Sequence, residues 1–179
     1  MACSRKTIFP PSQPGDFIEQ PLILGGDSTT LEVAQLLPGF TDLTHQILSG
    51  DFALAQVLPG IPLLPPANIQ AISKRQAPGD FPNGREVTML GSVSGPSSGK
   101  VRGIQGAIRL PARGNVNFPF WIYSGSILYE ARNVAGDSGG VVLERDNTAL
   151  GIHVAGNGTL GLMYPLRPFA DSSGLELVR

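Results

Sequence analysis

The sequence predicts an all-β fold, and three observations support this prediction. Apolar and polar side chains alternate in several short runs of the second half, as they do in half-buried strands. Turn residues separate these runs at intervals of about 8–12 residues, which is typical of sandwiches and barrels. The 179 residues include 23 Gly and 16 Pro but only 15% charged residues. This composition indicates an ordered, turn-rich β protein, since disordered chains carry more charge.

The first eighty residues are less regular than the remainder. Residues 31–37 fit a strand or a helix on their pattern alone. Residues 52–57 are a compact apolar segment directly after Gly50 and Asp51. Residues 58–82 contain many prolines and are expected to form a linker with one helical turn over 67–73.

The second half is predicted to contain a series of short strands and one helix. The strands are expected over residues 85–91, 100–110, 117–129, 141–143, 149–154 and 175–178. Residues 92–99 are expected to be a turn cluster, and Gly125 a bulge or bend within its strand. The helix is expected over residues 166–173.

Composition excludes several classes of function. The net charge is −1 and the basic residues are scattered, so neither nucleic acid nor an anionic membrane is an expected partner. Cys3 is the only cysteine, which rules out an intrachain disulfide and CxxC-type metal or redox chemistry. The N-terminal residues do not resemble a signal peptide, and no apolar run approaches 18 residues. We expect a soluble protein with no cofactor and no metal, and the compartment stays open.

The stretch GDSGG, from Gly136 to Gly140, is the strongest chemical signal. Its glycines allow the backbone to turn so that the N–H groups of Gly136 and Ser138 point at one spot. Two donors aimed at a developing oxyanion form the electrostatic half of acyl-transfer catalysis, and each contributes about 3–4 kcal/mol. The alternative is a tight turn between strands, because Gly, Asp and Ser favour turns in any case.

Over most of residues 15–179 the chain resembles the chymotrypsin/trypsin-like serine proteases. GDSGGVV and ALGIHVAG are similar to the nucleophile loop and to the strand that lines the specificity pocket, and residues 84–103 to the opening of the C-terminal barrel. The resemblance implies a trypsin-like double β-barrel in which the N-terminal barrel is incomplete. We expect a partial N-terminal barrel over residues 1–60, a crossover linker over 61–82 and a C-terminal β-barrel over 83–179.

The resemblance also implies roles for individual residues. Ser138 would be the nucleophile, and Asp51, in the segment DFAL, the carboxylate that orients the catalytic histidine. The N–H groups of Gly136 and Ser138 would form the oxyanion hole. His153 and Gly156 would bind substrate, because a G-x-H-x-x-G segment places a histidine against a Glu or Gln preceding the scissile bond in some members. The alternative for His153 is a half-buried histidine on a core strand.

The catalytic histidine itself is missing from its expected place. The resemblance puts it before Gly15, where MACSRKTIFPPSQP has none. His45 is the substitute within this chain, although it would need Asp80 to orient it; the alternative is a surface histidine. A histidine could also come from residues upstream or from another chain.

The sequence therefore predicts a trypsin-like serine peptidase acting on peptides or proteins, inactive unless a histidine is supplied. A pseudoprotease that serves as a binding or structural module is the alternative. We expect a homo-oligomer or larger assembly, because missing strands would expose sheet edges. A β-barrel binding domain unrelated to proteases is a third interpretation.

Overall fold

Strands dominate the computed structural model, which describes residues 15–24, 27–37, 47–48, 52–61, 69–75, 78–104, 107–111, 120–174 and 176. The strands of the first half are β1 (Phe17–Leu24), β2 (Asp27–Leu36), β3 (Ile47–Leu48), β4 (Ala55–Val57) and β5 (Ala71–Ile72). Those of the second half are β6 (Glu86–Gly91), β7 (Gly95–Ile104), β8 (Ala107–Pro111), β9 (Phe120–Ser124), β10 (Ile127–Glu130), β11 (Val141–Leu143), β12 (Thr148–Gly156) and β13 (Leu160–Pro165). A short 3₁₀ helix spans Pro78–Asp80, and helix α1 spans Leu166–Ser173.

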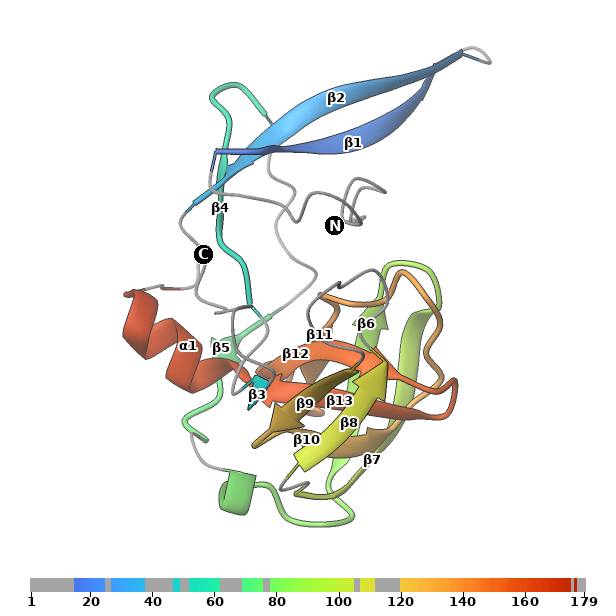
Figure 1. Ribbon diagram of the computed structural model, residues 1–179. Helices are drawn as coiled ribbons and strands as arrows, with labels where there is room; N and C mark the ends of the chain where they lie inside the picture. The colour runs from blue at the N-terminus through green and yellow to red at the C-terminus, as the bar shows by residue number, and fades with distance from the viewer. Residues whose placement is uncertain are drawn as a thin grey trace.

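A closed β-barrel forms the larger part of the molecule (Figure 1). Its strands follow the order β11-β6-β7-β10-β13-β12, and β11 also pairs with β12, so the sheet closes on itself. The neighbours along this order are antiparallel. Strand β5 adds to β12 in parallel, so the segment expected to be a linker contributes a strand to the barrel sheet. Closure satisfies the edge hydrogen bonds that an open sheet would leave exposed.

Alternating burial explains why these residues form barrel strands. Val87 and Met89 on β6 point into the barrel, and Ile127 and Tyr129 do so on β10, while the residues between them are more exposed. Together with residues from other strands these side chains make one apolar core, whose members are Phe81, Val87, Met89, Val101, Ile127, Tyr129, Ala131, Val142, Leu150 and Met163. Burial of this core is the main source of the fold's stability.

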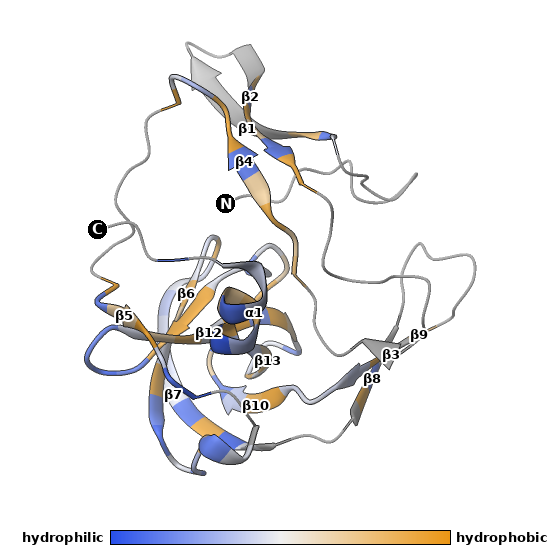
Figure 2. Ribbon diagram, turned by 90° about the vertical axis from the view of Figure 1, so that its left-hand side faces the viewer, coloured by the Kyte–Doolittle hydropathy of each residue, from blue (hydrophilic) through white to orange (hydrophobic). Residues whose placement is uncertain are grey.

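Two smaller sheets accompany the barrel. Strands β1, β2 and β4 form an antiparallel sheet, and the β1–β2 hairpin extends away from the barrel (Figure 1). Strands β8 and β9 form a second hairpin, which lies beside the barrel in Figure 2 and pairs in parallel with β3. This hairpin is inserted between barrel strands β7 and β10.

The structure corrects several of the predicted elements. The turn cluster expected over residues 92–99 shrinks to 92–94, because β7 begins at Gly95. The run 100–110 is two strands in different sheets, and so is the run 117–129, whose break falls at Gly125. Residues 71–72 are a strand where a helical turn was expected. Residues 31–36 are strand, and helix α1 lies where it was predicted.

Within the described residues, no helix has the length and apolar character that crossing a membrane requires.

Candidate active site

Ser138 lies exposed on the loop that connects β10 to β11. Its hydroxyl donates to the carbonyl oxygen of Val154 on β12, at 3.2 Å. The next two residues bind the same strand, since Gly139 N–H donates to His153 O and His153 N–H donates to Gly140 O, each at 2.8 Å. Strand β12 therefore fixes one side of the nucleophile loop.

The backbone N–H groups of Gly136 and Ser138 are the predicted oxyanion donors. Gly136 has a φ of 103°, in the region that favours glycine. Neither its N–H nor that of Ser138 donates to any residue that the structure describes. Gly140 N–H, in contrast, donates to Asp137 O at 2.9 Å, which closes the turn around Ser138. The two N–H groups assigned to an oxyanion therefore have no competing partner among the described residues.

The buried side chain of Asp137 fixes the nucleophile loop to neighbouring segments. Its carboxylate is fully buried and accepts N–H bonds from Val93 (2.9 Å), Ser94 (3.0 Å) and Val134 (2.8 Å), together with the hydroxyl of Ser94 at 2.7 Å. Burial acts to raise the pKa of Asp137, but the bonds from Ser94, Val134 and Val93 outweigh it and hold this pKa well below its usual range. Asp137 is therefore ionised at neutral pH and fixes the 92–94 turn to the nucleophile loop.

His153 is directed into the barrel and is only 2% exposed. Its Nδ1 shares a 2.7 Å hydrogen bond with the hydroxyl of Tyr129, and the two rings meet edge to face. Burial lowers the pKa of His153, opposed by the charge of Asp137, while burial and that same charge raise the pKa of Tyr129. Both side chains are thus neutral at neutral pH, and the imidazole has one nitrogen left for a further partner.

Replacing Tyr129 by phenylalanine should lower the free energy of unfolding by about 1–3 kcal/mol, because a buried imidazole nitrogen loses its partner. Urea denaturation at pH 7 measures this loss. A double-mutant cycle with His153→Phe isolates the contact, since the Tyr129→Phe change should cost much less once the imidazole is absent. Equal effects in both backgrounds would show that the hydrogen bond contributes nothing.

Asn133 and Gly156 pack against each other and form what we call the Asn133–Gly156 wall, at the end of the strand β12 that also carries His153. The Asn133 amide is buried, donates to Ala131 O at 2.8 Å and accepts from Gly158 N–H at 3.2 Å. A Cβ at Gly156 would lie only 2.0 Å from Asn133 Oδ1. Glycine at position 156 is therefore required for this close approach.

A second apolar cluster packs against Val154 of β12. It contains Tyr123 and Tyr164, with Phe52 and Val154 packed against it. Phe52 also stacks on Phe169 of helix α1, with the ring centres 4.3 Å apart. The residue that follows Asp51 in the sequence is thus anchored to the strand that contacts Ser138.

Of the predicted site residues, Gly136 and Ser138 lie on the nucleophile loop, and Ser138 bonds to β12, the strand that carries His153 and Gly156. Asp51 and His45 lie outside the residues that the structure describes. Sequence reasoning missed Tyr129, Ser94 and Asn133, and it gave Asp137 no role. Of these four residues, only Asp137 could have been recognised from the sequence, because it lies inside GDSGG. Tyr129, Ser94 and Asn133 reach the site only through the fold.

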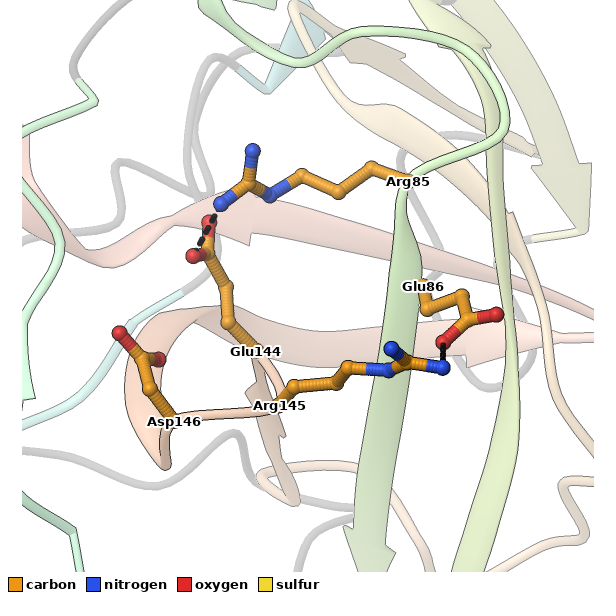
Figure 3. Close-up of a pocket in the computed structure, with 5 residues that line it drawn as sticks. All are labelled: Arg85, Glu86, Glu144, Arg145 and Asp146. Carbon is orange, nitrogen blue, oxygen red and sulfur yellow. Dashed lines mark hydrogen bonds and ion pairs between the residues drawn. The ribbon is translucent and has the colours of Figure 1, made fainter.

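The pocket in Figure 3 is a different feature, at the far end of β11 from the nucleophile loop. Four of its five lining residues form ion pairs, since Glu144 binds Arg85 and also Arg75 outside the pocket, and Arg145 binds Glu86. The fifth, Asp146, accepts the N–H of Thr148. None of the lining residues is Ser, Thr or Cys. Among the described residues there is also no group of three or more His, Cys, Asp or Glu side chains suited to a metal ion.

Comparison with known proteins gives matches at the level of structure. No family model matches the chain, and neither does any curated protein. The chain is similar to Cellulomonas bogoriensis chymotrypsin (TM-score 0.62, 21% identity, covering 84% of this chain and 79% of that one). It is similar to Thermobifida fusca Protease A (TM-score 0.63, 18% identity, 93% and 80%).

A third similar structure is a glutamic acid specific serine protease (TM-score 0.58, 15% identity, 88% and 90%), described as using a histidine triad in substrate binding. At these identities the matches establish the fold. The chain therefore has the trypsin-like double-barrel fold of the bacterial chymotrypsin-like serine proteases.

Proposed function

We propose that this chain is a trypsin-like serine peptidase that hydrolyses peptide bonds through an acyl-enzyme on Ser138. The observation that carries the proposal is the exposed hydroxyl of Ser138 beside two N–H groups, of Gly136 and Ser138, with no partner among the described residues. The serine oxygen attacks the scissile carbonyl, and these N–H groups stabilise the negative charge that develops on the carbonyl oxygen. The amine leaves with a proton, and water then hydrolyses the ester.

Proton removal from Ser138 requires an imidazole that His153 does not supply, because its side chain is buried and bonded to Tyr129. We assign the orienting carboxylate to Asp51. The position of Phe52, packed in the cluster that contains Val154, supports this assignment, since Val154 O accepts the Ser138 hydroxyl. The imidazole would come from His45, from residues upstream or from another chain. Without it, turnover falls by about 10⁴–10⁶.

We propose that the enzyme prefers substrates with Glu or Gln immediately before the scissile bond. His153 has one imidazole nitrogen beyond its bond to Tyr129, and this nitrogen suits a side-chain carboxylate or amide oxygen. Gly156 is exposed and ends the strand that carries His153, which supports a substrate side chain lying beside this end of β12. The similarity to a glutamic acid specific protease, although limited to the fold, is consistent with this preference.

A pseudoprotease is the second candidate. The hydrogen bond between His153 and Tyr129 favours it, because His153 is then not available as the base for Ser138. In that case the barrel would bind a peptide or assemble with other subunits without cleaving anything. The two candidates differ in the reactivity of Ser138, which can be measured directly.

A fluorophosphonate probe tests the nucleophile. We expect labelling that is slow, for lack of a described base, and confined to Ser138. Labelling should vanish in Ser138→Ala and persist in Ser172→Ala, which removes an exposed hydroxyl on helix α1. Labelling that survives Ser138→Ala would refute the peptidase assignment. A fast rate that His45→Ala abolishes would make His45 the base and remove Asp51 from its assigned role.

A further inference from the structure

The turn between β6 and β7 presents an apolar side chain beside the nucleophile loop. Val93 is 63% exposed, yet its side chain lies against Gly136, where an added Cβ would meet Val93 Cγ2 at 2.7 Å. An exposed valine alone is unremarkable on a protein surface. This one differs because it contacts a residue that carries one of the two oxyanion donors.

The turn is held rigidly in this position. The N–H groups of Val93 and Ser94 both donate to Asp137 Oδ1, and the Ser94 hydroxyl donates to Asp137 Oδ2. The Ser92 hydroxyl donates to Gly136 O. Val93 therefore has a fixed backbone at the edge of the site, and a ligand that contacts it need not order a loose loop.

The nucleophile loop separates two sides of the site. Strand β12 binds the loop at Ser138, Gly139 and Gly140, whereas the 92–94 turn binds it at Gly136 and Asp137. A substrate carbonyl on Ser138 that places its acyl side chain toward His153 and Gly156 occupies the β12 side. The part of the peptide that leaves would then lie on the opposite side of the loop, where Val93 is exposed against Gly136.

We propose that Val93 is a specificity-determining residue that contacts an apolar side chain within the first two residues after the scissile bond. This inference rests on the proposed peptidase function. The turn suits an apolar side chain because the hydroxyl protons of Ser92 and Ser94 are already donated to Gly136 O and Asp137. Residues 91–96, GSVSGP, carry no charge, so a charged side chain would lose water there without gaining a partner.

Leaving-group preference tests the contact. Peptides that share one acyl portion ending in Gln should be compared with Leu or Asp at the first or second position after the bond. We expect wild type to prefer Leu, and Val93→Thr, which keeps size and branching, to reduce that preference about three- to tenfold in kcat/KM. Leu31→Thr is the control, because Leu31 is also an exposed apolar residue but belongs to β2, in the hairpin that extends away from the barrel. It should leave the preference unchanged.

The methyl ester of the same acyl portion separates this inference from the proposed function. Its leaving group is too small to reach Val93, so Val93→Thr should hydrolyse it as wild type does. If Val93→Thr lowers ester and peptide turnover equally, Val93 only supports the nucleophile loop and the inference is wrong. If the ester shows no Ser138-dependent turnover, the peptidase assignment fails instead.

A binding measurement decides the contact even for an inactive chain. In Ser138→Ala, a peptide that spans the bond with Leu after it should shift the methyl resonances of Val93 in ¹³C-methyl NMR spectra. The Asp-containing peptide should shift them less at equal concentration. Unchanged Val93 methyls in the presence of the Leu peptide, with shifts elsewhere at the site, would overturn the inference.

Discussion

Replacing Asp137 by alanine is expected to lower the free energy of unfolding by about 3–5 kcal/mol and to stop labelling of Ser138 by a fluorophosphonate. The carboxylate is fully buried and accepts four hydrogen bonds, from Val93, Val134 and twice from Ser94. Alanine would leave these donors without partners in a place that water does not reach, which is costly. It would also detach the 92–94 turn from the nucleophile loop, so the N–H groups of Gly136 and Ser138 would lose their alignment.

The effect of Asp137 should depend on pH in a definite direction. Its pKa in the folded protein lies below the value of about 3.9 expected in the unfolded chain. The stability that its charge contributes is therefore complete above about pH 4 and declines as the pH falls toward the folded pKa. The difference in unfolding free energy between wild type and Asp137→Asn, measured with urea, should be largest near pH 6 and shrink by pH 3.

Glu86→Ala is the matched control for a lost carboxylate. Glu86 is exposed and pairs with Arg145 on the surface, so its removal should change stability by less than about 1 kcal/mol. If Asp137→Ala cost no more than this control, the buried hydrogen bonds would not stabilise the loop. Normal labelling of a folded Asp137→Ala would show that the oxyanion donors are aligned by other contacts.

Regular alternation made the barrel strands predictable. Val87 and Met89 alternate with polar or less buried neighbours, and β6 was found where this pattern placed it. The pattern failed where the chain passes from one sheet to another, as between β7 and β8. It also failed at residues 95–99, whose Gly, Pro and Ser favour turns locally but pair with β6 along the barrel. Tertiary pairing overrode local preference at these residues.

The site divides in the same way between local and distant contacts. The turn at GDSGG was predictable from the sequence, because the glycines and Asp137 that shape it lie within a few residues of Ser138. The partners of that turn could not be found by pattern. Ser94 and Tyr129 lie 43 and 24 residues from Asp137 and His153 respectively. Neither serine in a turn cluster nor tyrosine in an apolar strand is unusual, so nothing marked them until the fold brought them to the site.

Gly156→Ala is expected to cost about 1–3 kcal/mol of unfolding free energy and to weaken binding of Glu- or Gln-containing peptides. The new Cβ would lie 2.0 Å from Asn133 Oδ1 and 2.7 Å from the backbone oxygen of Leu160, both too close for any carbon. Asn133 is buried and bonded to Ala131 and Gly158, so it cannot move aside without breaking those bonds. The displaced amide would alter the end of β12, the strand that carries His153.

Two further variants separate this clash from a general effect of replacing glycine. Gly79→Ala adds the same methyl group where nothing lies within 4 Å, and it should change stability by less than about 0.5 kcal/mol. Asn133→Ala removes one of the two obstacles, so Gly156→Ala should cost less in that background than in wild type. The rescue should be incomplete, because the Leu160 oxygen belongs to the backbone of β13 and stays in place. Additive effects of the two substitutions, measured by urea denaturation, would show that Asn133 and Gly156 do not form a common wall.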